Sequence, residues 1–191
     1  FYRLVGDIMH TFFFPQSVAV FGVSCSPFNM GRTIAENLYR FGFKGDVYLF
    51  GDKGDIVMGK EVYKDIEDLE VVPDLAVFLI PAAYLPEKLK ACGRKGIRRA
   101  IIESAGFSEF REDRKSLEKE ILDIALDWNM RIIGPNCVGI VNLENGLTLP
   151  FYPMDPKNVK RGPVAFISQS GGLVHDIMGL AHCESLGIDK L

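Results

Sequence analysis

The sequence predicts an α/β protein built on a Rossmann-like, doubly wound parallel sheet, and three observations lead to this fold class. Five short apolar runs recur along the chain, and each is apolar at consecutive rather than alternate positions. Such runs are typical of strands in a parallel sheet that helices cover on both faces. Segments with helical spacing and short links separate the runs, as in right-handed βαβ units. The expected strands are 17–21, 47–50, 75–80, 100–102 and 130–133.

The spacing of apolar residues predicts three helices between these strands. Each helix carries one apolar stripe with members three or four residues apart. Glycines at 42, 93 and 96 stand where the first two helices should end. The three stripes consist of Ile34, Leu38 and Phe41, of Leu85, Leu89 and Cys92, and of Leu117, Ile121, Ile124 and Trp128.

Changes in composition divide the chain into four predicted parts. Residues 1–14 are expected to form a short amphipathic helical segment, and residues 15–145 form the Rossmann-like domain. Prolines and basic residues over 146–161 indicate an extended connector. Residues 162–191 hold a strand at 164–167 and a helix, with Leu173, Ile177 and Leu180 expected to face inward. We interpret them as the first βα unit of a second, flavodoxin-like domain that continues beyond Leu191.

Composition excludes several classes of protein. The chain has 191 residues and a formal net charge of −3, with no block of like charge, so neither a nucleic acid nor a membrane surface is an expected partner. The uncharged stretch 11–31 contains proline, serine and asparagine, so it is not a membrane helix. The cysteines form no CxxC pair, so neither a disulfide framework nor a metal site is expected. We therefore expect the protein to be cytoplasmic. The cysteines are Cys25, Cys92, Cys137 and Cys183.

The link after the first strand is a candidate phosphate site, because ligands of doubly wound sheets bind at the carboxyl ends of the strands. It runs from Gly22 to Gly31 and leads into a helix, whose N-terminus offers free N–H groups and partial positive charge. A nicotinamide-dinucleotide fingerprint needs G-x-G-x-x-G, but Ser24 and Pro27 stand at the second and third glycine positions. Asp52 follows Gly22 by 52 − 22 = 30 residues and is able to hold a ribose. An NAD(P)-binding Rossmann domain and a plain turn without ligand therefore both stay open.

Two later turns carry similar chemistry. In residues 133–139, glycines permit close approach, Asn136 offers an amide, and Cys137 is either a thiol beside a ligand or a small buried filler. In residues 168–172, Ser168 and Ser170 offer hydroxyls before two glycines at a helix start. This turn fits an anion site, and it equally fits an ordinary serine N-cap.

Six motifs in register resemble the CoA-binding region of the NDP-forming acyl-CoA synthetases. That family includes ADP-forming acetyl-CoA synthetase and the α subunit of succinyl-CoA synthetase. The resemblance runs from about Phe14 to the end of the chain. The motifs are the strand and turn at 15–24, the rest of that loop at 27–31, the stretch 75–86, the SAGF turn at 104–107, IGPNCxG at 133–139 and SQSGxL at 168–173.

The resemblance implies a coenzyme A site along these turns. The first loop would hold the phosphorylated end of CoA, through Gly22, Ser24, Pro27 and Met30. Lys53 would meet a phosphate or the ribose, although Gly51-Asp52 replaces the family's Asn-Pro before it. The pantetheine would be lined by Pro81, Ala82, Ser104, Ala105 and Gly106, with Asn136 and Cys137 near its thiol. A phosphoryl group would be received by Ser168, Ser170, Gly171 and Gly172.

The resemblance also implies a reaction, acyl-CoA + NDP + phosphate ⇌ carboxylic acid + NTP + CoA. The family's phosphorylated histidine would lie beyond Leu191, and His10, His175 and His182 do not match it. His175 is either a substitute relay base or a histidine on the helix surface. We therefore expect no catalytic residue in this chain, no turnover by the chain alone, and an ATP-grasp domain or subunit as partner in a larger oligomer. A CoA-sensing regulatory domain fused to a protein acetyltransferase is the alternative.

Overall fold

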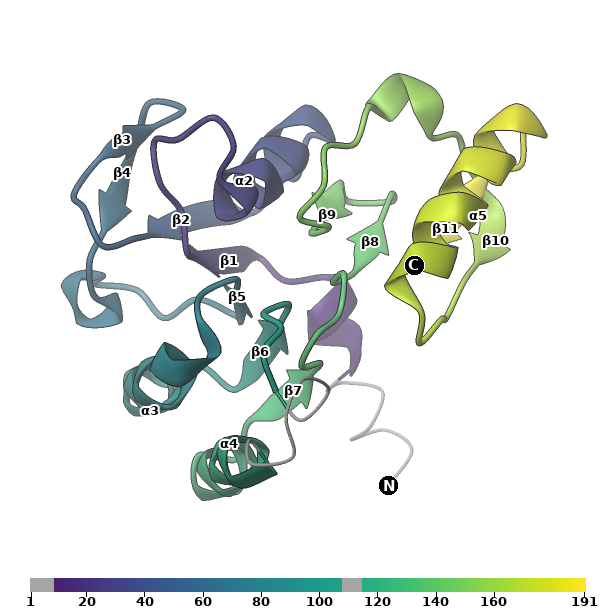
Figure 1. The fold of residues 1–191 in the computed structure, drawn as a ribbon. Coiled ribbons are helices and arrows are strands. Elements are labelled where there is room, and N and C mark those ends of the chain that lie inside the picture. Colours follow the sequence, from purple (N-terminus) through teal and green to yellow (C-terminus); the bar gives the residue numbers. More distant parts are fainter. Residues whose placement is uncertain (1–8, 108–114) are drawn as a thin grey trace.

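A computed structural model describes residues 9–107 and 115–191 of the chain (Figure 1). Its centre is a seven-stranded sheet with the order β3-β4-β2-β1-β5-β6-β7. The pairings from β4 to β7 are all parallel, and β3 pairs antiparallel with β4. The predicted doubly wound α/β fold is confirmed.

The five predicted strands are present, each with ends within two residues of the prediction. They are β1 (Ser17–Phe21), β2 (Asp46–Phe50), β5 (Leu75–Phe78), β6 (Arg99–Ile102) and β7 (Arg131–Ile133). The three helices between them are α2 (Met30–Arg40), α3 (Leu85–Lys95) and α4 (Lys115–Asp127). Because the strands are parallel and close in register, their carboxyl ends form one edge of the sheet.

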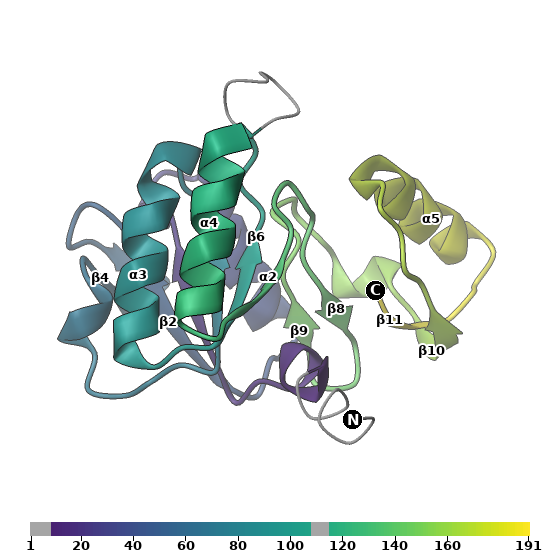
Figure 2. The same ribbon diagram turned by 90° about the horizontal axis from the view of Figure 1, so that it is seen from below.

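Helices cover both faces of this sheet, which explains why its strands are apolar throughout. On one face, Ile34 and Leu38 of α2 pack in a cluster with Val18 and Val20 of β1. On the other face, α3 and α4 lie side by side (Figure 2) and pack in a cluster with Ala19 and Phe21 of β1 and with alternate residues of the neighbouring strands. Each large apolar side chain buried in this way stabilises the fold by about 1.5–3 kcal/mol.

A hairpin that the sequence analysis does not predict extends the sheet beyond β2. It consists of β3 (Ile56–Val57) and β4 (Lys60–Tyr63), joined by Met58 and Gly59 in left-handed conformations. Val57 and Val62 are buried, whereas Ile56 is 75% exposed. The strands are too short and too charged to give a periodic signal.

A second sheet of four strands has the order β10-β11-β8-β9. Its members are β8 (Val141–Asn142), β9 (Leu147–Thr148), β10 (Arg161–Ala165) and β11 (Ile188–Lys190). Residues on both sides of the predicted boundaries at 145 and 161 thus share one sheet, and those boundaries stay predictions. The expected extended connector contains β9 and a short 3₁₀ helix, η4 (Pro156–Asn158), and β10 lies earlier than the expected strand 164–167.

The segment between β9 and β10 is fastened to α2 by one buried asparagine. The Asn37 Nδ2 donates to the carbonyls of Pro150 at 2.7 Å and Tyr152 at 2.8 Å. Its Oδ1 accepts from the N–H of Met154 at 3.0 Å. A fully buried amide with all these bonds made fixes the position of residues 150–154.

The inward face of the last helix, α5 (Gly171–Cys183), differs from the prediction. The buried residues are Val174, Met178 and Ala181, whereas Leu173 is 51% and Leu180 is 63% exposed. The expectation of Leu173 and Leu180 facing inward is wrong, and Ile177 is half-buried. Apolar residues occur all round this helix, so two different stripes have helical spacing and the sequence does not choose between them.

Parts of the predicted N-terminal segment lie outside the described residues. Residues 9–13 are helical, and Phe12 is buried against the cluster that includes Val18 and Val20. Leu4 and Ile8, which we also assign to this helix, fall in the part that is not described. No helix of residues 9–107 and 115–191 has the length and apolar character needed to cross a membrane.

Candidate functional site

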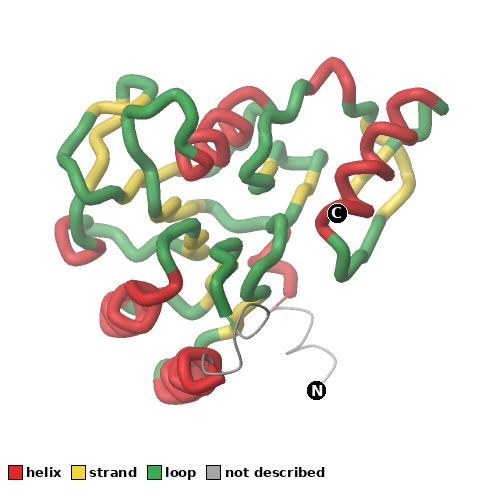
Figure 3. Tube along the Cα trace, viewed as in Figure 1, coloured by secondary structure: helices red, strands yellow, loops and turns green. Residues whose placement is uncertain are grey.

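Loops gather at the carboxyl ends of β1, β2, β5, β6 and β7 (Figure 3). At the end of β1, Gly22 has a φ of +97°, and a Cβ there would lie 2.1 Å from the carbonyl oxygen of Leu79. At the start of α2, a Cβ on Gly31 would lie 2.5 Å from the carbonyl oxygen of Gly22. Gly31 therefore lets the first turn of α2 approach the end of β1, and Gly22 lets the loop after β1 approach the segment after β5, more closely than a larger residue would.

Asn29, the N-cap of α2, holds the loop after β1 in place. Its Oδ1 accepts from the N–H of Arg32 at 2.7 Å and of Ser24 at 3.1 Å. Its Nδ2 donates to the carbonyl of Gly22 at 3.0 Å. One side chain thus joins the start of the helix to the first residues of the loop. The sequence analysis does not assign Asn29, although an asparagine just before an apolar helix is an N-cap signal.

The free donors of this loop lie in the first turn of α2. The N–H groups of Gly22 and Val23 donate to the carbonyl of Phe50 at 3.0 and 2.9 Å, and the N–H of Ser24 is held by Asn29. Within the described residues, no oxygen accepts from the N–H of Met30 or Gly31. These two groups stand at the positive end of an 11-residue helix, where an anion is stabilised.

The residues expected along the neighbouring loops differ in exposure. Lys53 and Asp52 are both exposed on the loop after β2, and Pro81 is exposed after β5. Ala82 is 7% exposed and packs in the core, which leaves it little surface for a ligand. Pro27 and Met30 are exposed, and Ser24 is half-buried.

Ser104 joins the ends of β5 and β6. Its Oγ accepts from the N–H of Ile80 at 3.0 Å and donates to the carbonyl of Phe78 at 3.3 Å. The hydroxyl is buried and already bonded in both directions, so Ser104 positions the two loops. Its neighbour Ala105 is exposed, and Gly106 has a φ of +107° that favours glycine.

The loop after β7 packs directly on this segment. A Cβ on Gly134 would lie 2.3 Å from the carbonyl oxygen of Ile102, and the N–H of Asn136 donates to the carbonyl of Ser104 at 3.0 Å. The Cys137 Sγ lies 3.5 Å from the same Ile102 oxygen. Burial raises the pKa of the Cys137 thiol to about 11, so the sulfur is a thiol at neutral pH.

Glu103 is a buried acid beneath this loop, and the sequence analysis does not identify it. The residue is 2% exposed, and neither carboxyl oxygen has a hydrogen-bond partner among residues 9–107 and 115–191. A Cβ on Gly139 would lie 2.3 Å from Glu103 Oε1. Burial raises the pKa of this carboxyl well above its usual value, which favours the neutral acid. The Tyr152 hydroxyl is likewise buried without a partner, and Glu103 contributes to raising its pKa after burial itself.

One pocket of about 440 Å³ unites two of the predicted groups. Asn136 and Cys137 line one side, and Gly171 and Gly172 at the start of α5 line the other. Tyr152 and His175 complete the wall, with their rings edge to face at 5.1 Å. Gln169 also lines the pocket and is a further residue that the sequence analysis does not assign.

The two serines before α5 cap the helix. The Ser170 Oγ accepts from the N–H of Leu173 at 3.3 Å, and the Ser168 Oγ accepts from the N–H of Ser170 at 3.1 Å. The capping interpretation of this turn therefore holds in the structure. It does not exclude an anion, because capping leaves the N–H groups of Gly171 and Gly172 at the positive end of the helix.

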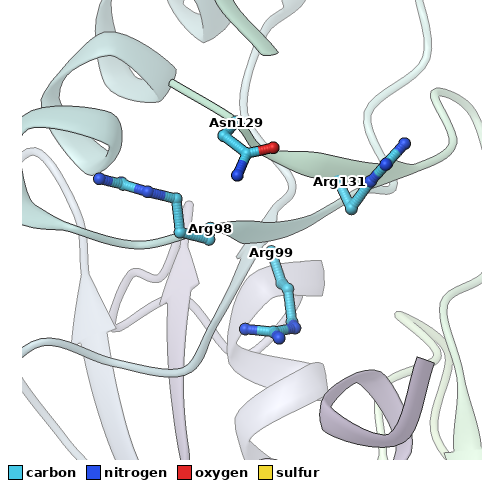
Figure 4. Close-up of a pocket in the computed structure, with 4 residues that line it drawn as sticks. All are labelled: Arg98, Arg99, Asn129 and Arg131. Carbon is cyan, nitrogen blue, oxygen red and sulfur yellow. The ribbon is translucent and has the colours of Figure 1, made fainter. Parts of the chain in front are cut away.

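A second pocket, of about 230 Å³, lies at the opposite edge of the sheet, where β6 and β7 begin. Arg98, Arg99, Asn129 and Arg131 line it, and Figure 4 shows the three guanidinium groups pointing in different directions. The Arg98 Nη1 donates to the carbonyls of Gly93 at 2.8 Å and Ile97 at 3.0 Å. The arginines do not converge on one point, so this pocket is a poorer anion site than the carboxyl edge.

No group of three or more His, Cys, Asp or Glu side chains in residues 9–107 and 115–191 is placed to hold a metal ion. The four cysteines carry free thiols, with Cys92 buried in the core.

Comparison with known proteins gives one family and consistent relatives. The family model described as "CoA binding domain" matches residues 16–142. The acetate–CoA ligase (ADP-forming) II subunit alpha of Pyrococcus furiosus is 38% identical over 94% of this chain and 38% of its own length. The acetate–CoA ligase (ADP-forming) of Methanocaldococcus jannaschii is 38% identical over 93% of this chain and 24% of its own length.

A solved structure has the same fold. The dinucleotide-forming acetyl-coenzyme A synthetase 1 of Candidatus Korarchaeum cryptofilum, in complex with phosphate and ADP, superposes with a TM-score of 0.88 at 35% identity. The match covers 95% of this chain and 38% of that one. The chain therefore spans well under half the length of the relatives that it matches.

Proposed function

The chain belongs to the CoA binding domain family, and on this premise we propose that it is the CoA-binding portion of an ADP-forming acyl-CoA synthetase. The complete enzyme would catalyse acyl-CoA + ADP + phosphate ⇌ carboxylic acid + ATP + CoA. Since the chain corresponds to 24–38% of the two relatives named above, that activity belongs to the longer protein. The chain itself supplies the binding site for one substrate.

The phosphorylated end of CoA binds at the first turn of α2. The N–H groups of Met30 and Gly31 donate to the pyrophosphate, and the helix dipole adds positive potential there. Asn29 keeps these donors aimed outward by fixing the loop before the helix. Lys53, on the next loop, adds a positive charge for a phosphate or the ribose. The absence of a Cβ at Gly31 lets the start of α2, which carries these donors, pack closely against the carbonyl of Gly22.

The pantetheine arm then crosses the ends of β5 and β6 towards the loop after β7. Pro81, Ala105 and Gly106 line this path, while Ser104 positions it from below. The thiol of CoA reaches Asn136 and Cys137. Because the Cys137 thiol has a pKa of about 11, it stays protonated and does not compete with the CoA thiol as a nucleophile.

Acyl and phosphoryl chemistry takes place in the pocket between the loop after β7 and the start of α5. There the N–H groups of Gly171 and Gly172 face the site of the CoA thiol across about 440 Å³ of space. These N–H groups stabilise the negative charge of a phosphate held at this helix start and the negative charge that develops when the phosphate attacks a thioester. The ATP-grasp partner that would pass the phosphoryl group to ADP is supplied by the rest of the enzyme.

The observation that carries this proposal is the pocket, because it joins a thiol-binding loop and an anion-binding turn that are more than thirty residues apart. Isothermal titration of the chain with CoA and with NAD tests it. Micromolar binding of CoA with no heat from NAD is expected. Binding of NAD but not CoA would overturn the proposal in favour of a dinucleotide-binding Rossmann domain.

A further inference from the structure

Phe28 is a solvent-exposed aromatic side chain on a loop that hydrogen bonds hold in place. It is 92% exposed, more than Tyr39 and Tyr84, two further exposed aromatic residues, which are 77% and 61% exposed. The loop on either side is fixed by side-chain bonds. The N–H of Phe28 faces Ser26 Oγ at 3.4 Å, and Arg32 Nη1 donates to the carbonyl of Cys25 at 2.9 Å. The Asn29 side chain bonds to Gly22 and Ser24 at the start of the loop.

The position of Phe28 relates it to one end of CoA. This step rests on the proposed function. Met30, whose N–H is proposed to donate a hydrogen bond to the pyrophosphate, follows Phe28 by two residues. A base joined to that phosphate through one ribose is therefore within reach of Phe28. In the sheet order β4-β2-β1-β5-β6-β7, the pantetheine path leaves β1 towards β7. The adenosine must therefore leave β1 in the other direction, towards the loop of β2 that carries Lys53.

The loops after β1 and β2 pack closely against each other where they leave the sheet. The N–H groups of Gly22 and Val23 both donate to the carbonyl of Phe50, the last residue of β2. A Cβ on Gly51 would lie 2.1 Å from the carbonyl oxygen of Val23. The loop after β1 thus carries an exposed aromatic ring and the neighbouring loop carries an exposed lysine, a pair that suits a flat base with a charged ribose phosphate.

We propose that Phe28 is the stacking platform for the adenine ring of CoA and selects for the adenosine end of the molecule. Aromatic rings bind bases through their faces, and this stacking is worth about 1–3 kcal/mol per base when the aromatic residue is truncated to alanine. A ring already exposed on a fixed loop loses little conformational freedom on binding, so most of that gain appears as affinity.

Titration of the Phe28→Ala chain with CoA and with 4′-phosphopantetheine, which lacks the adenosine, tests the proposal. We expect the affinity for CoA to fall about 5- to 150-fold while the affinity for phosphopantetheine stays unchanged. Phe28→Trp retains or strengthens binding of CoA, because the larger ring keeps the stacking face. Tyr39→Ala is the matched control, since it removes another exposed aromatic side chain near the far end of α2.

Three outcomes would overturn the proposal. Unchanged CoA affinity in Phe28→Ala shows that adenine binds elsewhere. An equal loss for CoA and phosphopantetheine shows that Phe28 only shapes the phosphate loop. If the unaltered chain binds neither compound, the proposed function fails as well. If the unaltered chain binds both, either of the first two outcomes refutes only the role of Phe28 and leaves the proposed function standing.

Discussion

Asn29→Ala should destabilise the protein more than the loss of an ordinary helix cap. Removal of an N-cap side chain costs about 1 kcal/mol. Asn29 makes two further hydrogen bonds, to Ser24 and Gly22, and each such bond contributes about 0.5–1.5 kcal/mol. The three contributions together predict a loss of about 3 kcal/mol in the free energy of unfolding. Urea denaturation followed by circular dichroism measures this change.

Asn29→Asp separates the effect of the Asn29 side chain on stability from the effect of a negative charge on CoA binding. Aspartate keeps the oxygen that accepts from Ser24 and Arg32 but lacks the donor to Gly22, so it should lose about 1 kcal/mol. Its negative charge beside the proposed phosphate position should weaken CoA binding much more than this loss explains. Unfolding free energies within 0.5 kcal/mol of the original chain for Asn29→Ala would refute the reasoning, as would equal stability of the two variants.

Three other predictions concern the same edge of the sheet. Gly31→Ala should weaken CoA binding at least about tenfold by titration, because its Cβ would lie 2.5 Å from a carbonyl oxygen, whereas Gly179→Ala, with open space around it, should bind normally. Glu103 has a folded pKa raised by burial above 4.5, so its contribution to stability is greatest below that pH and falls as pH rises to the folded pKa. Glu103→Gln should remove this part of the pH dependence in urea titrations, and an unchanged slope would contradict the assignment. Cys137, with a pKa of about 11, should react with iodoacetamide more slowly at pH 8 than exposed Cys25. Mass spectrometry of the labelled peptides measures both rates, and faster labelling of Cys137 would contradict this prediction.

The parallel strands were predictable because burial on both faces leaves a local signal in the sequence. Val18 and Val20 point to one face of β1 and Ala19 and Phe21 to the other, so the run is apolar at every position. The second sheet leaves no such signal. Its pairing of Lys190 with Asn142 joins residues far apart in the chain, and β8 and β9 have two residues each.

The candidate site was predictable at its turns and much less so at its supports. The sequence analysis singles out both groups that line the larger pocket, because their glycines and polar residues follow strands. Asn29 and Glu103 escape it for different reasons. A loop asparagine has many possible partners, and only the fold brings Gly22 and Ser24 to it. Glu103 directly follows an apolar strand, and an acidic residue at that position is ordinarily expected to be exposed to solvent.

A crystal structure of the chain with bound CoA tests the central claim most directly. The pyrophosphate should lie within about 3 Å of the N–H groups of Met30 and Gly31, with the thiol in the pocket beside Asn136 and Cys137. Density for CoA at the arginine-lined pocket where β6 and β7 begin, with the carboxyl edge empty, would contradict the account.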